Sequence, residues 1–280
     1  MFFLRALVFI EPTLKWGEGV LLHTDLSIDD FPKQNQIVWA PHFYDGIQLL
    51  TKSYRNWVTW DIFDNFLVFS SENVEHSYTK SIYTQSQTCK LGNDAIPTLV
   101  GEIGISMDMN ATDTDLPYAY RSNDFFAQSQ AANGLMRGLE NNLISFTWWN
   151  YSPDNTNILG DLWNQEDLSI FSVDQITDKD DLFSGGRAID VIIRPYARKV
   201  AGIPKYMRFD PYSIHREFIF EYTADANILA PTEIYIPHYQ FPSGINVHLT
   251  HGKFEYSPKT QTLFIYHHGS SLNVVTVTKK

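Results

Sequence analysis

A single carboxylate lies at the end of an apolar segment near the middle of the chain. The segment P-T-L-V-G-E-I-G-I covers residues 97–105, and its apolar part predicts a buried strand at Thr98–Val100, with Glu102 soon after it. Because a buried carboxylate is costly unless it is paired, an isolated one at a strand end is a candidate for catalysis. The alternative is a surface glutamate where the strand leaves the core.

Other groups that can do chemistry also follow apolar segments. His42 and Tyr44 come after the predicted strand Gln36–Trp39, and because they are two residues apart they share one side of an extended chain. Trp148 and Trp149 end another apolar segment. A carboxylate oriented by a histidine and a tyrosine, beside an indole that stacks on a sugar ring, is suited to glycoside hydrolysis. The carboxylate would attack the anomeric carbon.

These groups need a scaffold that brings strand ends together. Strand-like segments, among them Ala6–Ile10 and Leu143–Trp149, alternate with helix-like ones in the first two-thirds of the chain. The predicted helices are Asp61–Ser70, Glu72–Lys90, Asp124–Asn142 and a closing helix Arg187–Lys199. Short apolar strands alternating with helices indicate parallel βα units. In a (β/α)8 barrel the carboxyl ends of such strands form the catalytic face.

The last third of the chain has a different pattern, with short alternating segments separated by Pro, Gly, Asn and Ser. The predicted strands are Glu217–Thr223, Thr232–Ile236, Ile245–Thr250, Lys253–Tyr256, Thr262–Tyr266 and Asn273–Thr278. The prediction is an α/β chain, with part of a (β/α)8 barrel over residues 1–201 and an antiparallel β-sandwich over residues 202–280. The histidines of the second domain show no metal-ligand spacing, so we expect packing or surface roles for them.

Net charge and cysteine content argue against several classes of function. The 280-residue chain has a net charge of −11, which argues against nucleic acid and against an electrostatic grip on anionic membranes. Cys89 is the only cysteine, so no internal disulfide can form and a reducing compartment is expected. No cofactor, signal peptide or membrane-spanning segment is predicted, and a cytoplasmic or vacuolar location is expected.

Five segments together resemble one family. They are A-P-H-F-Y-D-G (40–46), P-T-L-V-G-E-I-G-I (97–105), F-T-W-W-N-Y (146–151), G-D-L-W-N-Q-E-D-L-S (160–169) and G-G-R-A-I-D-V-I-I-R-P-Y-A (185–197). In this order and spacing, with a β module behind them, the chain resembles glycoside hydrolase family 5. The match is to its fungal branch of steryl-β-glucosidases and endoglycoceramidase-related glucosylceramidases. The resemblance implies a retaining β-glucosidase acting on a glycolipid.

The resemblance also implies roles for individual residues. Glu102 matches the nucleophile at the end of the seventh barrel strand, and His42 and Tyr44 match the pair that supports it. Trp148 matches the aromatic residue after the eighth strand, and Trp149 is a further substrate-binding candidate. In the loop that borders the glucose pocket, the candidate ligands of sugar hydroxyls are Asp161, Asn164 and Glu166.

One family feature is missing from the sequence. The acid/base glutamate belongs to an Asn-Glu-Pro motif, and the nearest match is Glu11-Pro12, where Ile10 replaces Asn. About one βα unit separates Glu11 from His42, so Glu11 fits the fifth strand and the chain is expected to hold strands five to eight. The second half of the barrel would then lack its acid/base, and its partner would be the missing amino-terminal half. The alternative is that Glu11 itself is the acid/base.

Two other functions stay open. One is a non-catalytic module that binds carbohydrate or the missing half-barrel, and the other is an unrelated α/β fold in which Glu102 and His42 are satisfied polar residues. The aglycone is also open. Aromatic segments such as Tyr54–Trp60 and Tyr118–Tyr120 can line an apolar cleft or pack on the barrel, and a peripheral contact with a membrane surface is compatible with a lipid-linked sugar.

Overall fold

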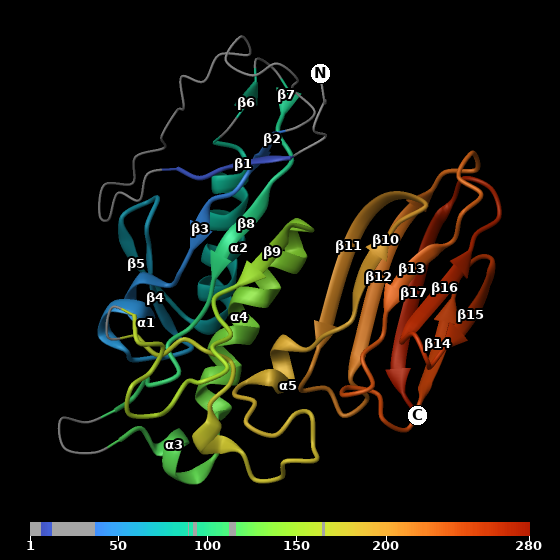
Figure 1. Cartoon of the computed structure of the whole chain (residues 1–280). Coiled ribbons are helices and arrows are strands. Elements are labelled where there is room, and N and C mark those ends of the chain that lie inside the picture. Colours follow the sequence, from blue (N-terminus) through green and yellow to red (C-terminus); the bar gives the residue numbers. More distant parts are fainter. Residues whose placement is uncertain (1–6, 13–36, 89, 92–93, 112–115, 164–165) are drawn as a thin grey trace, which may run out of the picture. The chain divides into compact units, whose positions relative to one another are not determined.

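The structure is a computed structural model that describes residues 7–12, 37–88, 90–91, 94–111, 116–163 and 166–280 (Figure 1). Asn164 and Cys89 lie outside the described residues. The chain divides into two compact units, Met1–Ala188 and Ile189–Lys280. The boundary predicted after residue 201 falls inside the second of these units, because that unit already includes a strand before this point.

Parallel strands form the centre of the first unit. They are β1 (Val8–Ile10), β2 (Ile37–Trp39), β3 (His42–Phe43), β8 (Leu99–Ile103) and β9 (Ser145–Trp148). β1 pairs with β2, and β3, β8 and β9 lie side by side in that order, all in parallel (Figure 1). A parallel bridge between Trp39 and Thr98 connects β2 to the start of β8, so the five segments form one continuous run. The predicted parallel βα pattern is confirmed for these strands.

Two long helices pack against each other in this unit. They are α2 (Ser71–Ser86) and α4 (Phe126–Asn142). In α4 the residues predicted to form the apolar face, including Leu135 and Leu139, are buried. A Cβ at Gly138 would lie 2.9 Å from Cδ1 of Ile82, so the glycine permits the close approach of the two helices.

Two predicted helices are wrong. Asp61–Ser70 forms most of a hairpin between β4 (Val58–Asp61) and β5 (Phe66–Phe69), because the Asp61 carboxylate accepts the amides of the turn and F-L-V-F continues as a strand. Arg187–Lys199 holds only a short helix, because Pro195 prevents its continuation. The remaining short elements of the first unit are α1 (Gly46–Thr51), β6 (Lys90–Leu91), β7 (Asp94–Ala95), α3 (Tyr118–Ser122) and a 3-10 turn at Val173–Gln175.

The second unit contains two four-stranded antiparallel sheets. Its elements are α5 (Ile189–Ile192), β10 (Tyr196–Lys199), β11 (Gly202–Asp210), β12 (Glu217–Ala224), β13 (Thr232–Tyr235), β14 (Ile245–Leu249), β15 (Lys253–Ser257), β16 (Thr262–Tyr266) and β17 (Leu272–Lys279). The sheet orders are β10-β13-β16-β15 and β11-β12-β17-β14. One buried cluster takes residues from both sheets, among them Phe218, Val275, Ile234 and Ile265. Six strands coincide with predicted segments, whereas β10 and β11 were not predicted.

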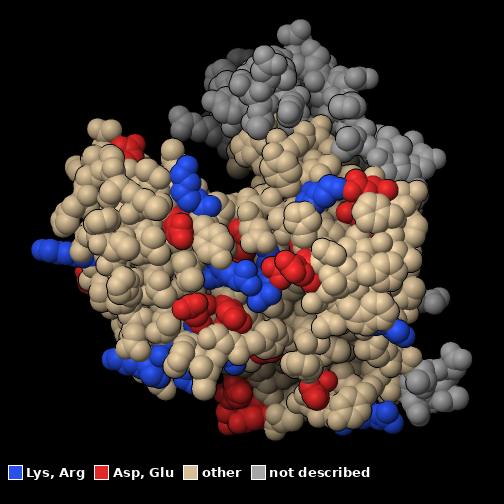
Figure 2. All heavy atoms as spheres, turned by 180° about the vertical axis from the view of Figure 1, so that it is seen from behind, with Lys and Arg blue, Asp and Glu red and all other residues tan. Residues whose placement is uncertain are grey.

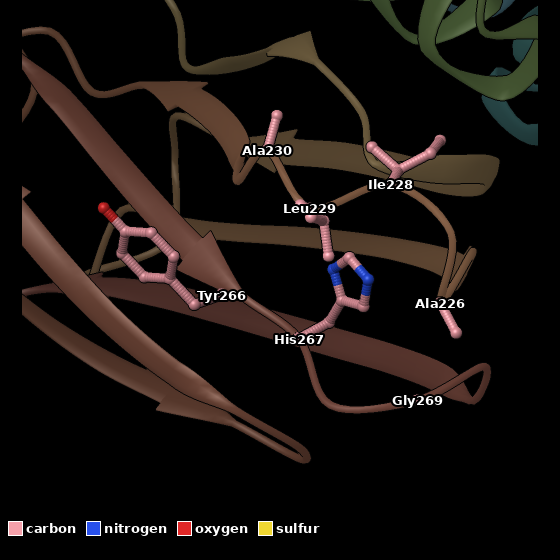
Figure 3. Close-up of a pocket in the computed structure, with 7 residues that line it drawn as sticks. All are labelled: Ala226, Ile228, Leu229, Ala230, Tyr266, His267 and Gly269. Atoms are coloured by element: carbon pink, nitrogen blue, oxygen red, sulfur yellow. The ribbon is translucent and has the colours of Figure 1, made fainter.

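A small pocket of about 220 Å³ lies in the second unit (Figure 3). Its walls are mainly aliphatic, and His267 closes one side. Nε2 of His267 is 3.0 Å from the carbonyl oxygen of Asp225, and Nε2 of His238 is 2.8 Å from the carbonyl oxygen of Pro258. Both histidines therefore hold neighbouring loops, in line with the packing role expected for them. Among the residues described, no cluster of side chains has the make-up of a metal site.

The surface charge is mixed. On the face drawn in Figure 2, acidic and basic side chains are interspersed across a mainly uncharged surface and do not gather into one extended basic area. Within the described part of the chain, no helix combines the length and the apolar character needed to cross a bilayer.

Candidate active site

Glu102 lies within a strand and not after it. β8 continues three residues beyond the predicted Thr98–Val100, and Glu102 faces His42 in the register of β3 and β8. A Cβ at the preceding residue, Gly101, would lie 3.1 Å from the carbonyl oxygen of Ala40, so glycine allows the two strand paths to approach here. The Glu102 side chain keeps 28% of its surface exposed, which leaves it open to a ligand.

One oxygen of Glu102 is contacted by both predicted supporting residues. The Tyr44 hydroxyl donates a hydrogen bond to Oε2 across 3.0 Å, and Nδ1 of His42 lies 3.2 Å from the same oxygen. Neither contact uses Oε1. The carboxylate is therefore held through one oxygen while the other can face a substrate.

Tyr44 keeps its proton over a wide pH range. Burial raises the pKa of its hydroxyl well above the ordinary value for tyrosine, and the negative charge of Glu102, the hydrogen bond to it and the charge of Glu166 act in the same direction. A phenol that stays protonated remains a hydrogen-bond donor to Glu102. The electrostatic effect also shows that Glu166 lies near this site.

His42 stands between two glutamates. Its Nε2 lies 3.2 Å from Oε1 of Glu11, and its Nδ1 makes the contact with Glu102. The imidazole is 12% exposed, and the Glu11 side chain is 51% exposed. Because the two carboxylates approach opposite ring nitrogens, a protonated ring would form an ion pair with both. Glu11, which follows β1, therefore contacts the site through His42.

Trp148 and Trp149 lie on the other side of Glu102. Trp148 pairs with Ile103 in the register of β8 and β9. The indole Nε1 of Trp148 is buried and has no hydrogen-bond partner among the described residues, so a substrate or water oxygen would satisfy it. A Cβ at Gly104 would lie 2.1 Å from the carbonyl oxygen of Trp149, so only glycine fits at this position.

The loop after β9 uses Asp161 internally. Its Oδ1 accepts a hydrogen bond from Asn155 Nδ2 at 2.9 Å, and its Oδ2 accepts from the Leu168 amide at 2.7 Å and from Asn150 Nδ2 at 3.3 Å. These bonds make the carboxylate an organiser of the loop. A direct contact between Asp161 and a sugar hydroxyl stays a prediction.

Sequence reasoning missed a buried ion pair behind this loop. Arg187 and Asp167 are almost fully buried, and NH1 of Arg187 donates to Oδ2 of Asp167 across 3.0 Å. The Tyr120 hydroxyl donates to the same carboxylate, and burial, followed by the charge of Asp167, raises its pKa well above the ordinary value. Both members of the pair lie in the segments that carry the family resemblance, but no local pattern connects them.

Asp45, next to Tyr44, was also missed. Its carboxylate accepts the amide of Gln48 at 3.1 Å and so caps α1, and it accepts the hydroxyl of Thr59 at 3.0 Å from β4. The hydroxyl of Tyr78 on α2 donates to it as well. The buried Asp45 thus fixes the chain that leaves the site to both neighbouring elements.

The arrangement defines a class of protein. A carboxylate with one uncommitted oxygen, oriented by a phenol and an imidazole and bordered by indoles, has the parts of the nucleophile side of a retaining glycoside hydrolase. The second carboxyl group of such a site is not identified among the described residues.

One family profile matches the C-terminal part of the chain. Residues 194–278 match the profile described as the glycoside hydrolase family 5 C-terminal domain. The resemblance to family 5 is therefore confirmed over these residues.

Curated relatives agree with this family. The chain is 27% identical over 252 residues to a glucosylceramidase of Rhizopus delemar, a match that covers 82% of this chain and 36% of the relative. It is 26% identical over 302 residues to the ergosteryl-beta-glucosidase of Saccharomyces cerevisiae, which covers 83% of this chain and 38% of that protein. The chain thus spans little more than a third of the length of these relatives.

Solved structures show the same fold. Sterylglucosidase 1 of Cryptococcus neoformans superposes with a TM-score of 0.77 at 26% identity, over 88% of this chain and 39% of that one. Endo-glycoceramidase II from Rhodococcus sp. superposes with a TM-score of 0.61 over 98% of this chain and 49% of that one. Because the sequence identity is only 18%, this match shows a similar fold and nothing more.

Proposed function

We propose that this chain provides the nucleophile side of a retaining β-glucosidase that hydrolyses a glycolipid, either a steryl glucoside or a glucosylceramide. The observation that carries the proposal is the contact of both His42 and Tyr44 with Oε2 of Glu102, which leaves Oε1 for attack. The names of the relatives support the substrate class.

The proposed reaction has two steps. In the first, Oε1 of Glu102 bonds to the anomeric carbon while the glycosidic C–O bond breaks, and the leaving oxygen takes a proton from a general acid. In the second, water attacks the same carbon and gives its proton to the group that served as the acid, while the ester bond breaks and Glu102 leaves as a carboxylate. The hydrogen bond from Tyr44 stabilises the carboxylate before and after the ester, and the indoles of Trp148 and Trp149 offer a stacking surface for the sugar.

We assign Glu11 to positioning and not to the general acid. In retaining enzymes the two carboxyl groups are about 5–5.5 Å apart with the glycosidic bond between them. Here the ring of His42 occupies the space between Glu11 and Glu102. The acid/base group is then supplied from outside the described residues. The parallel strands β1, β2, β3, β8 and β9 correspond to barrel strands five to eight. We also propose that the protein is located in the cytoplasm or the vacuole.

Mechanism-based trapping tests the nucleophile. A 2-deoxy-2-fluoro-β-glucosyl fluoride has a leaving group that needs no proton, so it can label a site that lacks its acid. We expect a covalent glucosyl adduct on Glu102, located by mass spectrometry of peptides, and no adduct in Glu102→Gln. Glu72→Gln, an exposed glutamate on α2, is the matched control and should label normally. A label on another residue, or the absence of any label, contradicts the assignment.

A second candidate function is an interaction module for another half-barrel or for carbohydrate. The observation that favours it is the outer side of β1, which pairs only with β2 among the described strands. Leu7, Val8 and Phe9 are 59%, 46% and 53% exposed there. An open strand edge with apolar side chains is a template for pairing with a further strand. Calorimetric titration with a glucoside, together with mass determination in the presence of the amino-terminal part of a relative, distinguishes binding without turnover from catalysis.

A further inference from the structure

The β4–β5 hairpin buries a mainly polar side and exposes an apolar one. On its inner side Thr59, Asp61 and Val68 are buried. On its outer side Trp60 and Leu67 lie opposite each other in the strand register and are 40% and 44% exposed. A two-stranded sheet on a protein surface normally buries its apolar side and hydrates its polar side. An exposed apolar side of this kind indicates a surface that binds a partner.

Four side chains form this surface, which we call the aromatic hairpin face. They are Trp57, Trp60, Leu67 and Phe69. The rings of Trp57 and Phe69 stack with their centroids 6.3 Å apart, so the face is continuous across the two strands. Figure 1 places the hairpin beside α1, the helix that connects it to the strand carrying His42.

The inner contacts fix this orientation. The Thr59 hydroxyl donates to Oδ2 of Asp45 across 3.0 Å, and the Ser77 hydroxyl donates to Oδ2 of Asp61 across 2.9 Å. A register slip of one residue would exchange the two sides and break both bonds. The hydrogen bonds on the inner side therefore keep the aromatic side chains of the outer side exposed.

We propose that the aromatic hairpin face docks onto the surface of a neutral lipid bilayer. The inference rests on the proposed function, because a membrane holds the lipid-linked glucoside. Tryptophan is the side chain that favours the bilayer interface, and the Arg55 guanidinium lies 5.9 Å from the Trp57 ring, where it can reach a headgroup phosphate. The nearby Asp64 and Lys80 form an ion pair, so the rim is close to neutral.

Area and charge argue against a second copy and against an anionic membrane. Since a fully buried aromatic side chain covers 150–250 Å², four half-exposed side chains offer roughly 400 Å². This is less than the ~800 Å² per partner of a standard protein interface, so a second copy is disfavoured. The net charge of −11 opposes an anionic membrane, which leaves a zwitterionic surface as the favoured partner.

The hairpin is connected to the proposed site by short contacts. Asp45 directly follows Tyr44 and binds Thr59 on the inner side of β4. Docking through the outer side of the same strand would hold the Tyr44 end of the site near the membrane, where a glycolipid headgroup enters. The proposed surface and the proposed nucleophile are thus parts of one structural unit.

Flotation with phosphatidylcholine vesicles tests the proposal without any turnover. We expect the wild-type chain to float, and the Trp60→Ser, Phe69→Ser double variant to lose about tenfold or more in partition coefficient. The control is Tyr118→Ser with Leu182→Ser, which removes two apolar side chains that are 65% and 89% exposed elsewhere in the same unit, and it should float normally. Circular dichroism and urea midpoints establish that each variant is folded.

The outcomes separate docking from catalysis. Glu102→Gln should float like the wild type, so a failed nucleophile assignment leaves the docking result intact. Vesicles with added phosphatidylserine should bind no better than neutral ones. Equal flotation of the double variant and the wild type overturns the proposal, as does a wild-type chain that does not float. A wild-type dimer in sedimentation that the double variant dissociates would assign the face to a second copy and overturn it as well.

Discussion

Tyr44 donates its phenolic hydrogen to Oε2 of Glu102 across 3.0 Å, from the position just after β3, the strand next to that of the glutamate. We predict that Tyr44→Phe slows labelling of Glu102 by the fluorosugar about 10- to 100-fold, because a hydrogen bond to a charged group contributes about 1.5–3 kcal/mol. The labelling rate is followed by intact-protein mass spectrometry. Tyr83→Phe, at an exposed tyrosine of α2, is the control. An unchanged rate in Tyr44→Phe would show that the bond does not support the nucleophile.

Glu11 contacts His42 and not the reacting centre. We predict that Glu11→Gln slows reaction with good and poor leaving groups by the same factor, about tenfold, because it acts through the orientation of His42. A general acid behaves differently, since its loss affects poor leaving groups most and azide restores the rate. The measurement compares aryl β-glucosides of different leaving-group acidity, with the chain complemented by the amino-terminal part of a relative. A strong dependence on the leaving group would return Glu11 to the acid/base role.

Gly104 has no space for a side chain. We predict that Gly104→Ala lowers the free energy of unfolding by about 1–3 kcal/mol or more, because its Cβ would meet the backbone oxygen of Trp149. Urea denaturation measures the change. Gly46→Ala is the matched control, since a Cβ there meets nothing within 4 Å. It should be neutral or slightly stabilising. Equal stabilities of the two variants would contradict the close packing of β8 against Trp149.

Three tyrosines, two buried and one partly buried, donate to carboxylates, and they predict a loss of stability at high pH. Burial, assisted by the carboxylate, raises the pKa of Tyr44, Tyr78 and Tyr120 above the ordinary value near 10. Their contribution to stability is therefore fully present below about pH 10 and is lost as the pH rises towards the folded-state pKa, because the unfolded chain releases these protons first.

Urea midpoints measured between pH 7 and 11 test this dependence. We expect the free energy of unfolding to fall above about pH 10. The fall should be less steep in Tyr120→Phe, which has one such group fewer, and unchanged in the exposed-site variant Tyr118→Phe. A fall that is equally steep in Tyr120→Phe would exclude that tyrosine as a source of the effect.

The sequence was informative where the spacing of residues has a direct structural meaning. The spacing of two residues from His42 to Tyr44 predicts a common side of an extended chain, and both side chains do reach one oxygen of Glu102. The apolar periodicity of α4 predicts its buried face, and the alternation of polar and apolar residues predicts six strands of the second unit.

The sequence was less informative where pairing is long-range. The buried partners Asp167 and Arg187 are brought together by the fold, and neither residue has a local pattern that points to the other. Asp61–Ser70, which forms the turn and β5, was predicted as a helix from its helix-compatible patterning. In the hairpin the apolar side faces outward, so the usual relation between burial and hydrophobicity is reversed. Such reversals depend on a partner that a single sequence does not contain.

The position of His42 between Glu11 and Glu102 has a consequence for the charge of the site during turnover. With the ring protonated and both glutamates ionised, the three groups carry one net negative charge. When Glu102 becomes an ester, the remaining pair of Glu11 and His42 is neutral. In that protonation state the three groups would carry minus one while the developing positive charge forms on the sugar, which the negative charge favours, and zero in the ester.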